Sequence, residues 1–252
     1  MCFYYCSCKA SKKNGIKKLK SGSLPAKVDS VQQKEFYDKV LSPLFVRAEK
    51  GTETLLFLDA SHFVMGGDFL GCFYGKTRRF IKSFSGRMRY NVLGAIDFAT
   101  KEVLTVTNTT YITATQVCEM LQKISATYKN KTVSIVLDNA RYQKCKVVQE
   151  LADHLHISLV YLPPYSPNLN LIERLWKFVK GELRKQYYHD FTQFQQKIDT
   201  IIDSTSKINK EKISQLISKE VALFDDLKEI CPNTFVPTKP RRKKTKNSKS
   251  VV

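Results

Sequence analysis

Three carboxylates in this chain are placed where they could act together. Asp59 closes the apolar run LLFLD, Asp138 closes IVLD, and Glu173 follows the proline-rich stretch LPPYSPNLN. An acid that closes a buried strand lies at the rim of the sheet, where mixed α/β sheets bind their ligands. Like charges at short range raise one another's pKa, and a divalent cation removes that penalty. Carboxylate oxygens without nearby His or Cys favour Mg²⁺ or Mn²⁺ and a phosphoryl displacement between two such ions.

Each of these acids also has an ordinary structural interpretation. The prolines between 163 and 167 force a turn, after which Asn170 is a preferred N-cap and Glu173 occupies the N3 position of a capping box. Taken alone, this pattern favours a capping role for Glu173. A single Asp at a strand end is usually a turn residue, and Asp97, at the end of another apolar run, is the main rival to Asp59.

Hydrophobic patterning predicts the elements that would position these acids. Residues 29–50 predict a helix that begins at Asp29 or Ser30. Strands are expected at 54–61, 71–81, 89–99, 102–112, 133–140 and 158–164, and helices at 115–129, at 142–154, around Glu173 and twice after Phe191. Antiparallel strands followed by alternating helices and strands predict an α/β protein, with a mixed sheet covered by helices on both faces.

The composition is that of a globular protein with one main domain. The chain has 252 residues, of which 42% are hydrophobic and 26% charged. No apolar run approaches the roughly 18 residues of a membrane span, and the first residues lack the order of a secretory signal. The seven cysteines show no zinc-finger spacing, which favours reduced thiols. We therefore expect an intracellular protein with no membrane partner.

The net charge of +19 is concentrated at the two ends. Residues 1–20 and 239–249 together hold 13 Lys and Arg and no acid, which leaves +6 for residues 21–238. Such segments are expected to be disordered and to bind polyanions. The charge therefore favours nucleic acid as the partner, with a solvated tail of no function as the alternative.

The motifs around the three acids resemble those of a known family. LLFLDASHF, VLDNARYQ and LPPYSPNLNLIERLW are similar to the motifs of DDE transposases related to mariner, in particular the bacterial insertion-sequence family six-thirty. The 34 residues between Asp138 and Glu173 are typical of that group, and the resemblance covers residues 24–225. It implies an RNase H-like fold with a mixed five-stranded sheet, and an enzyme that cuts and rejoins DNA strands.

The resemblance also implies cofactors and partners. Asp59, Asp138 and Glu173 would be the catalytic residues and would hold two Mg²⁺ (or Mn²⁺) ions, with Asp59 shared by both ions. Independently of the resemblance, Asn139 is expected to orient the loop after Asp138. The partner would be double-stranded DNA, both the ends of the element and the target, bound by a homodimer when active.

Further residues are predicted from their positions near these motifs. His62 would face the metal site or DNA, with local packing as an equal alternative. Arg174, Lys177 and Lys180 lie on the helix of Glu173 and are predicted to contact phosphates. Trp176 falls on the apolar face of the same helix, which predicts core packing.

The predicted domain organisation is a basic leader with a linker helix, a catalytic domain, C-terminal helices and a disordered basic tail. The boundaries are 1–50, 51–190, 191–230 and 231–252. Members of the group usually carry a helix-turn-helix region, for which the leader is too short. We therefore expect a truncated protein or one half of a split reading frame, whose upstream half would be a partner.

Two other functions fit the same features. One is an inactive remnant that only binds DNA, and the other is an RNase H-like nuclease without strand transfer. In each case the expected location is with cellular DNA, at the nucleoid in the cytoplasm of a bacterium or in the nucleus of a eukaryote.

Overall fold

The computed structural model describes residues 29–66, 88–205 and 210–218. The strands are β1 (Thr54–Val64), β2 (Arg89–Asp97), β3 (Val103–Asn108), β4 (Val133–Leu137) and β5 (Ile157–Tyr161). They form one sheet in the order β3-β2-β1-β4-β5. The pairs β1–β2 and β2–β3 are antiparallel, whereas β1–β4 and β4–β5 are parallel. The mixed five-stranded sheet predicted from the sequence is confirmed.

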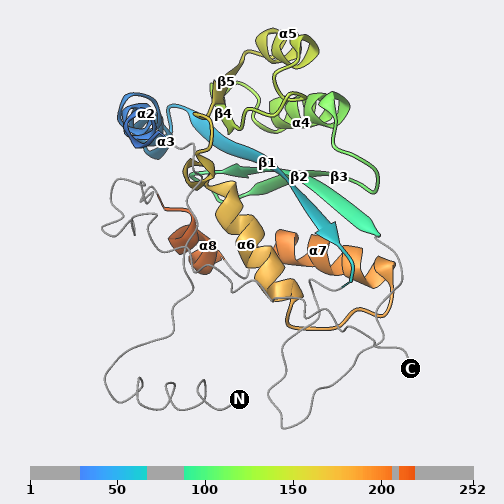
Figure 1. Ribbon diagram of the computed structural model, residues 1–252. Helices are drawn as coiled ribbons and strands as arrows, with labels where there is room; N and C mark the ends of the chain where they lie inside the picture. The colour runs from blue at the N-terminus through green and yellow to red at the C-terminus, as the bar shows by residue number, and fades with distance from the viewer. Residues whose placement is uncertain (1–28, 67–87, 206–209, 219–252) are drawn as a thin grey trace, which may run out of the picture.

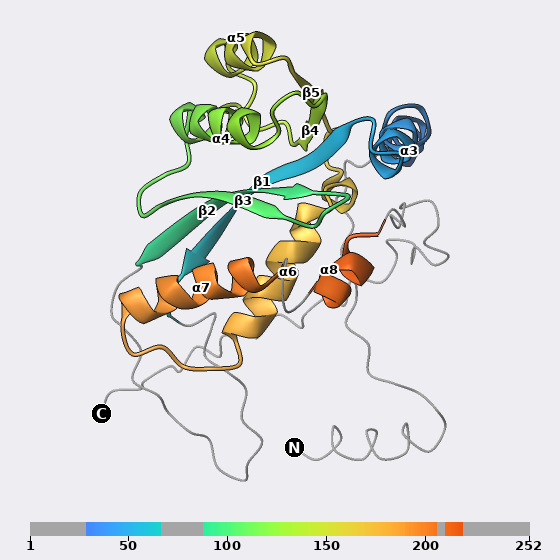
Figure 2. The same cartoon turned by 180° about the vertical axis from the view of Figure 1, so that it is seen from behind.

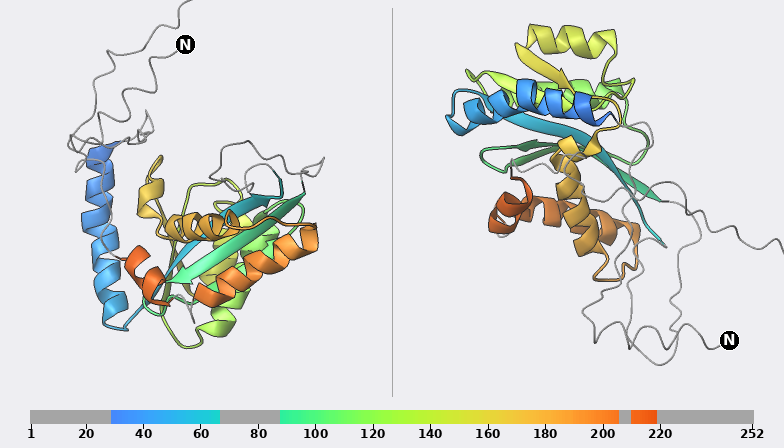
Figure 3. Two further views of the ribbon diagram at one scale, coloured as in Figure 1. Left: turned by 90° about the horizontal axis from the view of Figure 1, so that it is seen from below. Right: turned by 60° about the vertical axis from the view of Figure 1, so that its left-hand side comes forward.

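Helices cover both faces of this sheet. One face carries α4 (Ala114–Thr127) and α5 (Lys146–His154), and the other carries α6 (Ile172–Leu183) and α7 (Phe191–Thr205), as Figure 1 and Figure 2 show. The short helix α8 (Lys210–Leu216) packs against α6 and α7. Figure 3 shows α2 (Ser30–Phe36), the π-helical turn η1 (Tyr37–Leu41) and α3 (Ser42–Glu49) as one continuous rod alongside the sheet.

Side-chain alternation along the strands decides which face each acid reaches. Leu58 of β1 belongs to the buried cluster beneath α4 and α5, whereas Phe57 belongs to the cluster beneath α6 and α7. Asp59 is two residues from Phe57 and therefore shares the α6 face. Val136 of β4 also belongs to the α6 cluster, so Asp138 lies on that face as well. The sheet thus presents both aspartates to the same helix.

Most of the predicted elements are present, with shifted ends. The helix over 29–50 is confirmed as α2, η1 and α3, and the Asp29 carboxylate caps it by accepting from Gln32 N at 3.0 Å. The helix predicted at 142–154 begins later, at Lys146, because the chain after β4 turns several times first. The predicted strand 71–81 and the two basic ends lie outside the described residues. Among the helices that the structure describes, none is long and apolar enough to cross a membrane.

Candidate active site

Asp59 lies on β1, and a tryptophan of α6 fixes its orientation. The indole Nε1–H of Trp176 donates to Asp59 Oδ2 at 3.1 Å. Trp176 is 2% exposed, which confirms its predicted core packing, but nothing in the local sequence pattern indicates the hydrogen bond. The ring fits because Gly94, which pairs with Asp59 across β1 and β2, has no side chain. A Cβ at Gly94 would lie 2.6 Å from Trp176 Cη2.

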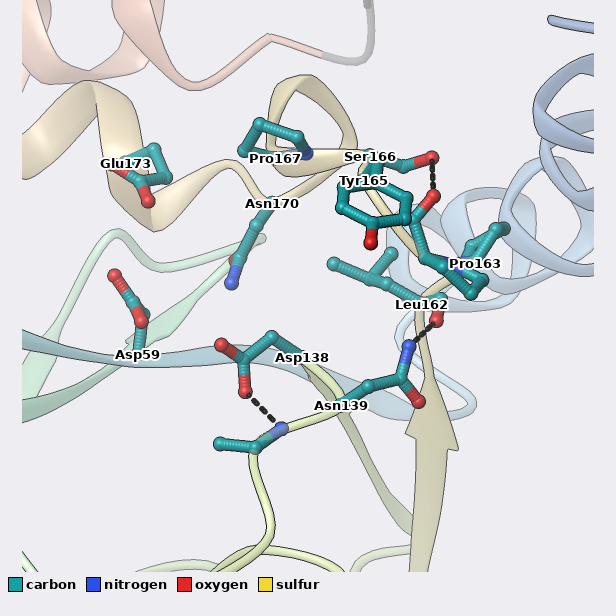
Figure 4. Close-up of a pocket in the computed structure, with 12 residues that line it drawn as sticks. Asp59, Asp138, Asn139, Leu162, Pro163, Tyr165, Ser166, Pro167, Asn170 and Glu173 are labelled. Atoms are coloured by element: carbon teal, nitrogen blue, oxygen red, sulfur yellow. Dashed lines mark hydrogen bonds between the residues drawn. The ribbon is translucent and has the colours of Figure 1, made fainter. Parts of the chain in front are cut away.

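Asp138 directly follows β4, where the chain leaves the sheet. Its Oδ1 accepts from Ala140 N at 3.0 Å, while its other oxygen points toward Asp59 (Figure 4). The side chain of Asn139 donates to the carbonyl of Leu162, just beyond β5, and so joins the ends of two parallel strands. This contact supports the prediction that Asn139 orients the loop after Asp138, which stays a prediction.

The turn before Glu173 packs against the protein core on one side and against α2 on the other, and it places Glu173 at the edge of the sheet. It contains the 3-10 helix η3 (Pro167–Leu169), whose Leu169 is fully buried. On the other side, the side-chain amides of Gln33 in α2 and Asn168 exchange two hydrogen bonds of 2.9 and 3.1 Å. Gln33 is itself fully buried, so the turn is fixed between the rod and the sheet.

The capping prediction for this turn is wrong. α6 begins at Ile172 with Leu171 as its N-cap and without a side-chain capping bond, so Glu173 is the second helical residue rather than N3. Asn170 does not cap because a tertiary contact takes its side chain: Nδ2 donates to the carbonyl of Leu58 at 3.3 Å. The Glu173 carboxylate is therefore not engaged in a capping box.

The three acids line one cavity of about 280 Å³. Asp59 and Asp138 approach it from the sheet, Glu173 approaches from α6, and the side chain of Asn170 extends toward the space between them (Figure 4). The structure thus brings together the carboxylates that the sequence singles out. Their catalytic role stays a prediction.

The electrostatics of the cavity are unfavourable for three bare carboxylates. Burial and, to a lesser extent, the charges of Glu173 and Asp138 together raise the pKa of Asp59 from its ordinary value of 3.8 to about 7. Burial also raises the pKa of Glu173, as does the charge of Asp138, while the ammonium of Lys180 lowers it. A bound cation would relieve this accumulation of negative charge.

The donor atoms suit a hard divalent cation. The polar side chains that line the cavity offer carboxylate, amide and hydroxyl groups, with no His or Cys among those described. Nowhere in the described part of the chain do three His, Cys, Asp or Glu side chains already surround one metal position. Mg²⁺ usually takes one or two carboxylates and keeps several waters, so the residues fit.

The sequence profile of one protein family matches more than half of the chain. That family is described as DDE superfamily endonuclease, and the match covers residues 54–195, which include all three acids. The chain belongs to this family. The sheet and the cavity both lie largely within the matched region.

Known proteins similar to this chain include an insertion-element protein and the Mos1 transposase. The chain is 28% identical over 101 residues to "Insertion element IS630 uncharacterized 39 kDa protein" of Shigella sonnei, and the match spans 39% of this chain and only 29% of that protein. The pre-cleavage Mos1 transpososome matches with a TM-score of 0.62 at 12% identity, over 85% of this chain and 68% of that chain. The catalytic domain of Mos1 mariner transposase matches with a TM-score of 0.53 at 12% identity, over 78% and 94%. These similarities confirm the RNase H-like fold.

Two other Mos1 structures that match are paired-end complexes, one with Mn and one with Mg. Both have a TM-score of 0.58, at 12% and 11% identity respectively. The first covers 84% of this chain and 68% of its own, and the second covers 85% and 67%.

Asp97, the rival to Asp59, is a turn residue in the structure. It is 3% exposed, and its Oδ1 accepts from Ala99 N at 2.7 Å and from Thr100 N at 3.1 Å. It stabilises the turn between β2 and β3 and is not among the described residues that line the cavity.

His62 lies outside the cavity. It is three residues beyond Asp59 on β1, so alternation places it on the opposite face of the sheet. Its Nδ1 is 2.6 Å from Asn91 Oδ1, which supports the local-packing alternative, while its side chain remains exposed. Contact between His62 and DNA stays a prediction.

The three predicted phosphate contacts on α6 differ in their surroundings. Arg174 Nη1 donates to the carbonyl of Leu216 at 2.8 Å, which satisfies the end of α8. Lys177 is exposed. Lys180 Nζ lies 5.7 Å from the ring centroid of Phe63 and lowers the pKa of Glu173. Their roles in DNA binding stay predictions.

Proposed function

We propose that this chain is the catalytic domain of a transposase that cuts DNA strands and joins them to new DNA with divalent cations. The observation that carries the proposal is the convergence of Asp59, Asp138 and Glu173 on one cavity in a member of the DDE endonuclease family. The insertion-element relative and the likeness to Mos1 transposase support transposition as the context. The Mos1 complexes with Mn and with Mg support these metals as cofactors.

We assign each acid a place in a site for two cations. The pKa of Asp59 responds to both Glu173 and Asp138, which supports Asp59 as the acid shared by both ions. Asp138 and Glu173 would each complete one of the two positions. When bound, the cations would stabilise the attacking and leaving oxygens of an in-line displacement at a phosphodiester.

The protein itself provides positioning in this reaction. The indole of Trp176 donates to one oxygen of Asp59, and the backbone N–H of Ala140 donates to one oxygen of Asp138. Each aspartate is therefore held in position before substrate binds. Fixed donors need little reorganisation at the moment of reaction, which is a large part of the catalytic effect in such sites.

The proposal extends to the partners of the reaction. The Mos1 structures described as a transpososome and as paired-end complexes support DNA ends as substrate and a paired assembly of two copies. Recognition of those ends would fall to a helix-turn-helix region of the same element. The protein would act where cellular DNA is found, at the nucleoid or in the nucleus.

A plasmid-nicking assay with Mg²⁺ or Mn²⁺ tests the proposal. Asp59→Asn, Asp138→Asn and Glu173→Gln are each expected to reduce nicking at least about 100-fold, which corresponds to about 3 kcal/mol of lost transition-state stabilisation. DNA affinity is expected to persist. Asp153→Asn, which alters an exposed carboxylate on α5, is the matched control and is expected to cut normally.

Three outcomes would contradict parts of the proposal. Cleavage in EDTA, or full activity of the Asp138→Asn protein, would eliminate the metal mechanism. Nicking without any joining of paired element ends to target DNA would leave a nuclease without strand transfer.

A further inference from the structure

The cavity has a second wall that the proposed metal site does not use. Figure 4 shows this wall on the other side of Asn170 from Glu173. It consists of three prolines and a tyrosine, namely Pro163, Pro164, Pro167 and Tyr165. None of these side chains carries a charge, so the wall suits a base or a sugar better than a phosphate.

The ring of Tyr165 is not part of the hydrophobic core. Tyr165 is 52% exposed and belongs to neither of the two hydrophobic clusters of the described residues. Its backbone φ is 58°, in the left-handed region that bulky residues rarely adopt, because Cβ then lies too close to the following carbonyl oxygen. Gly or Asn would form the same turn with less strain. The fold therefore does not require an aromatic ring here, and strain of this kind is concentrated at functional sites.

The turn holds Tyr165 in place before any ligand binds. On its N-terminal side, Leu162 N donates to the carbonyl of Leu137, at the end of β4, at 2.9 Å. On its C-terminal side, Ser166 is 4% exposed, and its Oγ donates to the carbonyl of Pro164 at 3.3 Å (Figure 4). The prolines on both sides restrict the backbone further. A side chain on such a frame loses little conformational entropy when it binds.

We propose that Tyr165 stacks on a DNA base that has left the double helix next to the phosphodiester in the cavity. This inference rests on the proposed function, because the acids must hold the phosphodiester for its nucleotide to reach the ring. The bases of a duplex stack on one another, so the ring can stack only on a base that has left that stack. Every base has a π face, so such stacking tolerates any sequence. Tyr165 thus binds the nucleotide beside the scissile bond and helps to position it.

The test measures single-turnover cutting with Mn²⁺ and a saturating concentration of the full chain. The substrates are an end-labelled duplex and the same duplex with mismatched bases at its centre, which are already unstacked. On the paired duplex, Tyr165→Leu is expected to slow cutting about 5- to 150-fold, which corresponds to about 1 to 3 kcal/mol for one stacked base. At the mismatches this defect is expected to shrink to about threefold or less, because the base no longer has to leave the helix. Tyr165→Phe keeps the ring and is expected to cut both substrates like the wild type.

A fluorescent base reports the stacking itself. 2-Aminopurine placed at the mismatches loses fluorescence when it stacks on an aromatic ring. After rapid mixing, the wild type and Tyr165→Phe are expected to quench this fluorescence before cutting begins, whereas Tyr165→Leu is expected to lose the quenching.

Two further variants separate stacking from support of the fold. Tyr111→Leu is the matched control, because Tyr111 is 72% exposed and is not among the described residues that line the cavity, so it is expected to cut and quench like the wild type. Tyr165→Asn removes the ring but accepts the left-handed backbone. Its Tm is expected to equal or exceed that of the wild type, while its cutting defect matches that of Tyr165→Leu.

Any one of three results would overturn the inference. The first is unchanged cutting by both Tyr165→Leu and Tyr165→Asn. The second is a defect of equal size on the paired and the mismatched substrate, which would show that the ring does not act on an unstacked base. The third is a Tm of Tyr165→Asn below that of the wild type, which would show that the ring supports the fold.

The failure of this inference is distinguishable from failure of the proposed function. If the wild type cuts with Mn²⁺ and Asp59→Asn does not, the metal-dependent site stands whatever the Tyr165 variants do. If the wild type cuts neither substrate with Mg²⁺ or Mn²⁺, the proposed function fails, and the inference fails with it.

Discussion

Ionised Asp59 is expected to destabilise the metal-free protein at neutral and alkaline pH. Its pKa is raised from 3.8 to about 7 by burial and by the charges of Glu173 and Asp138. Between these two pH values the folded protein binds more protons than the unfolded chain, so the free energy of unfolding falls as the pH rises. The full cost is present above pH 7 and disappears as the pH falls toward 4.

The size of this cost follows from the difference between the two pKa values. At about 1.4 kcal/mol per pH unit, the upper limit is about 4 kcal/mol. Asp59 retains some exposure, and solvent screens part of its charge, so we expect about 2 to 3 kcal/mol. Asp59→Asn removes the charge and keeps an oxygen that can accept from Trp176. In EDTA at pH 8 this variant is expected to be more stable than the wild type by that amount.

Differential scanning calorimetry in EDTA measures the effect. A gain of about 2 to 3 kcal/mol corresponds to about 4 to 12 °C in Tm for a protein of this size. The gain is expected to shrink to less than half at pH 5, where much of the wild-type carboxyl is protonated. The control Asp153→Asn is expected to show no change at either pH.

Metal is expected to reverse the order of stability. A ligand at 1,000 times its Kd stabilises the folded state by about 4.1 kcal/mol, which exceeds the 2 to 3 kcal/mol advantage of the variant, and only the wild type would gain this from Mn²⁺. The reasoning is refuted if Asp59→Asn is no more stable than the wild type in EDTA at pH 8, or if its gain is the same at pH 5.

Two further predictions concern packing and charge. Gly94→Ala is expected to lower the free energy of unfolding by about 1 to 3 kcal/mol in urea titrations and to reduce nicking, because the new Cβ would lie 2.6 Å from Cη2 and 2.7 Å from Cζ2 of Trp176. Stability equal to that of the wild type would show that the ring can move away. Deleting residues 239–252, which hold seven Lys and Arg and no acid, is expected to weaken binding to all duplexes alike. The slope of log K against log salt concentration should decrease by about 0.9 for each phosphate that the tail neutralises, and an unchanged slope would show that the tail does not touch DNA.

The positions of the acids were predictable because local rules determine them. A buried run such as LLFL must lie inside a sheet, so the aspartate that closes it lies at the rim. Prolines end one element and force a turn before the next, which places Glu173 near the start of a helix. Alternation along β1 could also have placed His62 on the face opposite Asp59.

The contacts that complete the site were not predictable, because each depends on a partner far away in the sequence. The capping preference of Asn170 is local, but the Leu58 carbonyl that takes its side chain is 112 residues away. The donor to Asp59 is Trp176, 117 residues away, and an apolar helical face predicts only that this ring is buried. In both cases the residue type allows more than one role, and a contact with a residue distant in the sequence determines which role the side chain has.

The paired amides of Gln33 and Asn168 join positions 135 residues apart and connect the N-terminal rod to the turn that carries Glu173. Coupling of this kind is reciprocal: a partner that displaces α2 changes the free energy of the arrangement in which the acids face one another, and occupancy of the cavity changes the free energy of displacing α2 by the same amount. A partner that binds to the rod would therefore change the fraction of molecules in which the acids face one another, without contact with any carboxylate.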